Sequence, residues 1–123
     1  MTEAEVIRIM RQHLEGQFPK TCPNCETVYP TLKNYLQNTN ILGSAISYDA
    51  EFRNWKPTQP LGTLTYANCR CGGTMSLSSE GLPLWRLWRL LNWARIETKK
   101  REMAPNDLLN YLRDEICKQV LGE

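Results

Sequence analysis

Two pairs of closely spaced cysteines are the residues whose type and spacing could do chemistry. Cys22 and Cys25 enclose a proline and an asparagine in TCPNCETVYP, and Cys69 and Cys71 lie in ANCRCGGT. A tight turn can aim two thiolates at one ion, and two such turns supply the four soft ligands of a tetrahedral structural site. The spacing therefore predicts that these four cysteines bind one metal ion, with Zn²⁺ as the favoured metal.

Three other interpretations of the cysteines compete with zinc. An iron–sulfur cluster also takes four thiolates, and the sequence does not separate it cleanly from zinc. A dithiol redox site at Cys22 and Cys25 needs the strand-then-helix context of a thioredoxin-like unit, whereas Cys25 leads into the β-like segment ETVYP. The third interpretation, buried cysteines without metal, fits poorly because four of the five cysteines lie in two tight, polar pairs.

The predicted metal site is structural rather than catalytic. A catalytic zinc keeps one position open for water and usually has histidine or carboxylate ligands, but four cysteines complete the shell. The only histidine, His13, falls in a predicted helix, and Cys117 lies at the edge of an apolar stripe, where a small core residue is commoner than a ligand. The sequence offers no convincing nucleophile–base pair, phosphate-binding glycine loop or carboxylate dyad, so we expect no enzymatic activity.

The β elements that would position the cysteines follow from alternation. Segments 61–69 and 73–79 alternate polar and apolar residues on either side of the second cysteine pair, which predicts a hairpin. Residues 27–30, TVYP, predict a third short strand directly after the first pair. Both cysteine pairs are thus expected at turns next to short strands.

Helical patterns flank this β region. Residues 3–15 carry apolar side chains at helical spacing, with Thr2 as the N-cap and Gly16 as the stop, and residues 31–38 predict one or two helical turns.

Two further helices are predicted near the C-terminal end of the sequence. Residues 82–103 favour one helix, Ala104-Pro105-Asn106 breaks it, and a second helix follows, capped by Asn106 or Asp107 and ended by Gly122.

The segment CPNC followed by a strand, with CRCGG at the tip of a hairpin, resembles a zinc ribbon over about residues 20–78. The resemblance implies a metal-stabilised β module and no particular partner. Two departures stand out. The second cysteine pair is one residue shorter than the usual spacing, and Glu26 follows Cys25 where ribbons often have glycine. We therefore predict an α+β chain forming a single domain over 1–123, with a helix over 1–17, a zinc-ribbon-like antiparallel β region over 18–79 and a two-helix hairpin over 83–122.

Composition restricts the class of protein. Hydrophobic residues at 41% and charged residues at 23% argue against disorder, and the net charge of +2 does not by itself indicate a nucleic-acid or membrane partner. The N-terminal residues carry acids in their first turn rather than the basic and apolar regions of a signal peptide, and no apolar run approaches the ~18 residues of a spanning helix. Five cysteines with no export signal predict a reducing, cytoplasmic location.

The segment LWRLWRLLNWAR, residues 84–95, predicts a helix with a wide apolar surface. At 100° per residue, one face comprises Leu84, Leu87, Trp88, Leu91 and Ala94. Trp85, Trp93 and Ile96 point toward other sides, beside Arg89. The aromatic side chains are either core residues under neighbouring elements or an interaction surface of the Trp/Arg composition that is enriched at interface hot spots.

Residues 86–101 contain six basic residues and one acid, Glu97. We hypothesise a regulatory or adaptor protein that presents this helix to a protein partner or a second copy of the chain. A nucleic-acid-binding zinc ribbon using segment 86–101, with Tyr66 and Arg70 at the hairpin tip, is the alternative. An iron–sulfur or thiol redox sensor is a third hypothesis, and membrane binding is disfavoured. The predicted partner-binding residues are Trp85, Arg86, Arg89, Trp93, Lys99, Lys100 and Arg101.

Overall fold

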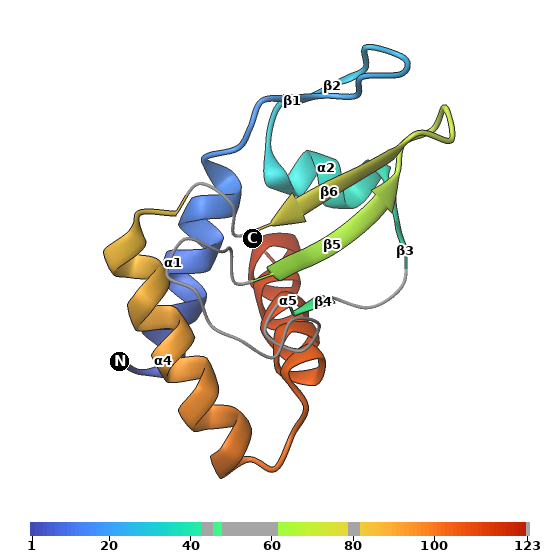
Figure 1. Ribbon diagram of the computed structural model, residues 1–123. Coiled ribbons are helices and arrows are strands. Elements are labelled where there is room, and N and C mark those ends of the chain that lie inside the picture. Colours follow the sequence, from blue (N-terminus) through green and yellow to red (C-terminus); the bar gives the residue numbers. More distant parts are fainter. Residues whose placement is uncertain (43–45, 48–61, 79–81, 123) are drawn as a thin grey trace.

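The computed structural model describes residues 1–42, 46–47, 62–78 and 82–122 (Figure 1). The helices are α1 (Glu3–Glu15), α2 (Leu32–Asn38), α4 (Leu84–Lys100) and α5 (Pro105–Leu121). The strands are β1 (Lys20–Thr21), β2 (Val28–Tyr29), β3 (Asn40–Leu42), β4 (Ile46–Ser47), β5 (Gly62–Asn68) and β6 (Thr74–Ser78). The predicted α+β class, with an N-terminal helix and C-terminal helices around a small β region, is confirmed.

The strands form two antiparallel sheets. In the smaller one, β1 pairs with β2, and Lys20 lies opposite Tyr29. In the larger one, β5 is central, because β6 pairs along one edge of it while β3 and β4 pair with opposite ends of the other edge. The predicted hairpin is therefore β5–β6, and the predicted strand after the first cysteine pair is β2.

Three of the helices start or stop where local chemistry dictates. The Thr2 hydroxyl accepts the Glu5 backbone N–H at 3.2 Å, which caps α1 as predicted. The Thr31 hydroxyl does the same for α2 through the Asn34 N–H at 3.1 Å. The expectation that Asn106 or Asp107 caps α5 is wrong. Its N-cap is Ala104, and Pro105 opens the helix because a first-turn residue needs no N–H partner.

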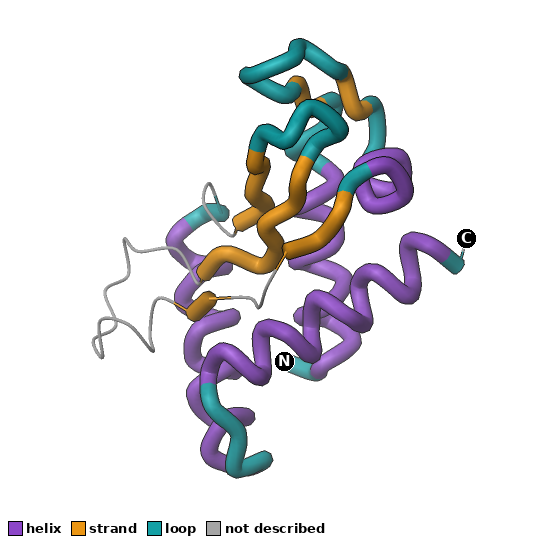
Figure 2. The backbone as a smooth tube through the Cα atoms, turned by 90° about the vertical axis from the view of Figure 1, so that its right-hand side faces the viewer, coloured by secondary structure: helices purple, strands orange, loops and turns teal. Residues whose placement is uncertain are grey.

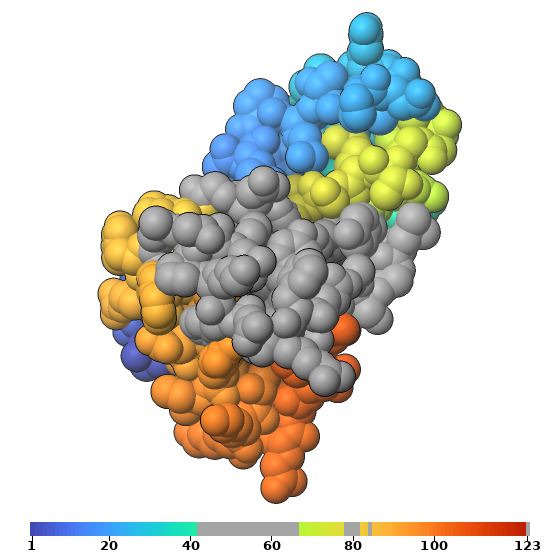
Figure 3. All heavy atoms as spheres, in the orientation of Figure 1, coloured from blue at the N-terminus to red at the C-terminus, as the bar shows by residue number. Residues whose placement is uncertain are grey.

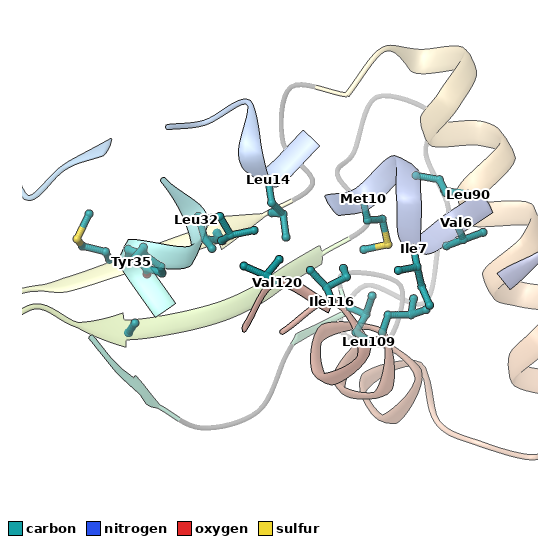
Figure 4. Packing of buried hydrophobic residues seen from close by; sticks show 14 of the residues in the cluster. Val6, Ile7, Met10, Leu14, Leu32, Tyr35, Leu90, Leu109, Ile116 and Val120 are labelled. Atoms are coloured by element: carbon teal, nitrogen blue, oxygen red, sulfur yellow. The ribbon is translucent and has the colours of Figure 1, made fainter. Parts of the chain in front are cut away.

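Helix α5 is the element around which the others pack. It contacts α1, α2, α4, β4 and β5. Leu109, Ile116 and Val120 of α5 point toward α1 and α2 (Figure 4). The strands lie between the helices and the loops that carry the cysteines (Figure 2). The hydrophobic core therefore runs from the helices through the β region to the cysteine end of the molecule, where it includes the buried Cys22 and Cys69.

Helix α4 is rotated relative to the face predicted for it. Leu87 and Leu91 are buried as expected, but Trp93 is only 8% exposed and Trp88 is 44% exposed. The buried arc is centred near Leu90, so Trp93 lies at its border and turns into the core. Trp93 is therefore a core residue, which is one of the two interpretations left open for the aromatic side chains of this helix.

Candidate metal centre

Two strand connections bring the four cysteines together at one end of the molecule. The β1–β2 connection carries Cys22 and Cys25, and the β5–β6 connection carries Cys69 and Cys71. The two connections lie against each other at the top of Figures 1 and 3. The four sulfur atoms all lie within 4.8 Å of one another. The predicted cluster, close enough to hold a metal ion, is therefore confirmed.

The sulfur–sulfur distances test whether one ion fits. A tetrahedral zinc with Zn–S bonds of ~2.3 Å separates its sulfurs by ~3.8 Å. The Sγ atoms of Cys22 and Cys71 are 3.7 Å apart, and those of Cys25 and Cys69 are 3.5 Å apart. Cys22 and Cys69 are buried whereas Cys25 and Cys71 are exposed, so the cluster has a protein side and a solvent side. All four side chains could ligate a single cation.

The first knuckle, residues 22–27, is closed by two backbone hydrogen bonds. The Cys22 N–H donates to the Thr27 carbonyl, and the Glu26 N–H donates to the Cys22 carbonyl, each at 2.9 Å. Glu26 adopts φ 63°, the left-handed conformation that glycine usually provides. The turn therefore forms without glycine, with Glu26 in the strained position.

The second knuckle, residues 69–73, repeats this arrangement in one residue fewer. The Cys69 N–H donates to the Gly73 carbonyl, and the Gly72 N–H donates to the Cys69 carbonyl, each at 2.9 Å. Gly72 has φ 88°. Gly73 is closely packed, because a Cβ there would lie 3.2 Å from Cβ of Asn24 and 3.3 Å from Sγ of Cys71.

Tyr29 of β2 is a buried hydrogen-bond donor to the cluster. Val28 faces solvent and Tyr29 faces inward, and the Tyr29 hydroxyl donates to Sγ of Cys69 at 2.9 Å. This hydrogen bond, helped by the Cys71 backbone N–H, lowers the pKa of Cys69 to about 6. The same bond and burial raise the pKa of Tyr29 to about 12. Tyr29 therefore stabilises a thiolate at Cys69.

The two exposed cysteines, Cys25 and Cys71, differ in the direction of their pKa shifts. The Asn24 side-chain amide donates to Sγ of Cys71 at 3.3 Å and, with the Gly73 N–H, lowers the pKa of that thiol. Hydrogen bonds from Thr27 also lower the pKa of Cys25, but the neighbouring thiols and desolvation outweigh them and raise it. Four thiols this close cannot all ionise without a compensating positive charge, which a bound cation supplies.

Sequence reasoning missed Tyr29 and Asn24 as neighbours of the sulfurs. The first could not be predicted from the sequence, because β2 has only two residues, exposed Val28 and buried Tyr29, which are too few to show an alternation. Tyr35 of α2 was also missed. Its ring packs edge-on against Tyr29 at 5.6 Å, and among the described residues its buried hydroxyl has no hydrogen-bond partner. Tyr29 and Tyr35 are thus two buried phenols in edge-to-face contact, and the hydroxyl of Tyr29 donates to the cluster.

The two other candidate ligands lie elsewhere, as predicted. Within the described part of the chain, the only group of cysteine, histidine and acidic residues close enough to hold a metal is the four-cysteine cluster. His13 is in the last turn of α1. Cys117 is partly buried in α5, where desolvation raises the pKa of its thiol.

The predicted partner-binding residues divide into two groups. Trp85, Arg86, Arg89, Lys99 and Lys100 follow one another along α4, and Trp85 is 57% exposed. Arg101 binds Glu3 at 2.9 Å and Glu97 at 2.8 Å, and its guanidinium lies over the buried Trp93 ring. Arg101 therefore ties the end of α4 to α1 through Glu3, and Trp93 is buried beneath its guanidinium. Arg70, at the tip of the second knuckle, donates to Asn38 of α2.

Among the described residues, no helix has the length and apolar composition that a membrane crossing requires. No family model matches this sequence, and no curated protein or solved structure matches it. The chemistry of the cysteine cluster and the exposed surface of α4 therefore carry the functional conclusions.

Proposed function

We propose that this chain is a non-enzymatic, cytoplasmic zinc-binding protein of the regulatory or adaptor kind, in which Cys22, Cys25, Cys69 and Cys71 hold one structural Zn²⁺. The observation that supports a single ion is the mutual approach of four sulfurs to within 4.8 Å. An iron–sulfur cluster attaches each thiolate to an iron atom of an iron–sulfide core, which spreads the four sulfurs farther apart than one central ion does. The spacing therefore favours one ion over a cluster.

The role of the ion is to join two pieces of β structure that are weak alone. Strands β1 and β2 have two residues each, and an isolated two-stranded hairpin is marginal in water. The first knuckle contacts the second through the sulfur atoms of the four cysteines and through the hydrogen bond from Asn24 to Cys71. Tyr29, which follows the first knuckle, adds a hydrogen bond to Cys69. Metal binding free energy becomes folding free energy in such a site.

A non-enzymatic role is supported by the ligand set. Four thiolates saturate a tetrahedral ion, so no position is left for a substrate or an activated water. A metal that only holds the fold leaves the function to the surfaces it supports. We therefore assign the chain an adaptor role, in which α4 is the surface presented.

Elemental analysis of freshly purified protein, together with an absorption spectrum, tests the proposal. We expect one zinc per chain and no absorption in the visible range. A coloured protein containing iron would contradict the zinc assignment and favour the redox-sensor alternative. Cys117→Ser is the matched control, because it removes a thiol without touching the cluster.

A further inference from the structure

The outward surface of α4 has an unusual composition. Three large apolar side chains are exposed on it, Trp85 at 57%, Trp88 at 44% and Ile96 at 63%. The only acid of the helix, Glu97, is 13% exposed and binds Arg101. We call the exposed residues of the helix the α4 outer face; they are Trp85, Trp88, Arg89, Asn92, Arg95, Ile96, Lys99 and Lys100. This face carries four cations and no acid.

A hollow adjoins the α4 outer face. It has a volume of about 340 Å³ and is lined by Met1, Arg89, Asn92, Trp93, Ile96 and Glu97. The lining thus combines apolar side chains (Met1, Trp93 and Ile96) with the guanidinium of Arg89. A partner that inserts one apolar side chain here can place a carboxylate next to a guanidinium.

We infer that the α4 outer face docks an acidic amphipathic helix of another protein. The inference rests on the proposed adaptor role and names the chemistry of the partner. Trp85, Trp88 and Ile96 lie within about 80° of one another around the helix, so they form one stripe along it. Such a stripe packs on the apolar stripe of a second helix, and Trp and Arg are the residues enriched at interface hot spots. Acidic residues flanking the partner's stripe would meet the four cations.

Charge excludes a symmetric pairing of α4 with α4 in a second copy of the chain. A two-fold contact would place four cations against the same four cations, with no acid on either face to compensate. The partner must therefore carry the opposite charge.

Two other classes of partner fit the surface less well. A helix that lies in a membrane surface separates its apolar face from its basic face, whereas Arg89 and Lys99 of α4 are interleaved with Trp85 and Ile96. Single-stranded nucleic acid is bound by stacking bases on aromatic rings in a basic groove. In α4 the guanidinium of Arg86 lies 5.0 Å from the Trp85 ring centroid, so it occupies a ring face that a base would need.

The test uses the full zinc-loaded chain and a synthetic helical peptide. The α4 outer face is ~22 Å long at 1.5 Å per residue, so a peptide of about 18 residues spans it. The peptide carries a leucine and phenylalanine stripe flanked by glutamates, and a second peptide has lysine in place of every glutamate. Binding is measured by fluorescence anisotropy of a label on the peptide. Oligo-dT and phosphatidylcholine–phosphatidylglycerol vesicles are measured in parallel.

We expect the glutamate peptide to bind and the lysine peptide not to bind. Trp85→Ala should weaken binding by about tenfold or more, the loss that follows truncation of a hot-spot residue. Arg89→Glu combined with Lys99→Glu leaves two cations and two acids on the face, so the preference for the glutamate peptide over the lysine peptide should be lost. Leu121→Ala, an exposed apolar residue of α5, and Arg8→Glu, an exposed cation of α1, are the matched controls and should change neither affinity.

Zinc content and circular dichroism of each variant show whether it is still folded and metal-bound, so that a loss of peptide binding can be assigned to the α4 outer face. Peptide binding that is absent, equal for both peptides or unaffected by the α4 substitutions in zinc-loaded protein would overturn the inference while leaving the metal assignment intact. Tighter binding of oligo-dT or of the vesicles would also overturn it, in favour of nucleic acid or membrane respectively.

Discussion

The two knuckles reach the same geometry with different sequences. In each, the first cysteine donates its N–H to the last carbonyl of the turn and accepts the N–H of the residue before that one. The residue that donates this N–H is left-handed in both, Glu26 in one and Gly72 in the other. The first turn takes six residues, 22–27, and the second five, 69–73, so the missing residue shortens the loop without changing how it closes.

The comparison shows that the two backbone hydrogen bonds define the knuckle. Glycine only lowers the conformational free energy of the left-handed residue in it. A non-glycine residue in the left-handed region costs ~1–2 kcal/mol. Glu26 tolerates that cost because the metal-binding free energy of such sites, on the order of 10 kcal/mol, exceeds it. The two knuckles should therefore depend equally on the metal and unequally on glycine, and substitutions can separate the two effects.

The largest expected effect is loss of the metal. Cys22→Ser and Cys69→Ser remove the buried leading thiolate of each knuckle, and each should reduce bound zinc sharply and unfold residues 20–78. Chelation should do the same while α1, α4 and α5 retain some helicity through their shared apolar core. Zinc analysis and thermal unfolding monitored by circular dichroism measure both effects. Full zinc content in one of these variants alone would show that the knuckles are not equivalent, and Cys117→Ser should leave the zinc content unchanged.

Next in size is the effect of the Tyr29 hydroxyl. Removing a hydrogen bond to a metal ligand typically costs 10–100-fold in metal affinity, and Tyr29→Phe removes the bond to Cys69 while keeping the buried ring. Tyr35→Phe is the matched control, since it deletes a buried hydroxyl that has no partner among the described residues. Competition with a zinc chelator should show weaker binding for Tyr29→Phe only. Equal losses in both variants would mean that ring packing, rather than the hydrogen bond, matters.

Substitutions of Gly72 and of Gly73 in the second knuckle should destabilise the protein for different reasons. At Gly72 an added Cβ meets nothing within 4 Å, so only the backbone conformation resists substitution. At Gly73 the added atom presses on Asn24 and on the sulfur of Cys71, and overpacking of this kind costs ~1–3 kcal/mol. Asparagine tolerates the left-handed region, so Gly72→Asn should be milder than Gly72→Ala, whereas Gly73→Asn should be at least as harmful as Gly73→Ala. Urea unfolding gives the free energy of unfolding of each zinc-bound variant. The reverse order at Gly72 would contradict the backbone explanation, and the reverse order at Gly73 would contradict the packing explanation.

Much of this arrangement could be predicted from the sequence because strong local patterns encode it. The four ligands, the β5–β6 hairpin and α1 each depend on spacing or periodicity that a few consecutive residues display. Strands β1, β3 and β4 have two or three residues, too few to show an alternation, and only pairing partners distant in sequence define them.

The rest depends on tertiary contacts that no local pattern contains. The rotation of α4 is an example. Its apolar residues extend over more than one face, so the side that turns inward is decided by contacts with other elements, including the ion pair of Arg101 with Glu3 of α1. The same holds for Tyr29, whose role appears only when the second knuckle places Cys69 beside it.

The smallest expected effect is a gain at Glu26. Replacing a left-handed glutamate by glycine relieves the backbone, and after the entropic cost of glycine is subtracted we expect Glu26→Gly to stabilise the zinc-bound protein by ~0.5–1 kcal/mol. Because folding of the first knuckle is coupled to metal binding, the gain should also appear as several-fold tighter zinc binding. Glu102→Gly is the matched control. It also has a positive φ, of 53°, but lies between α4 and α5, so the same substitution should raise stability without changing zinc affinity. If Glu26→Gly instead weakened zinc binding, the glutamate side chain itself would support the first knuckle, and the two knuckles would differ in more than the cost of one backbone angle.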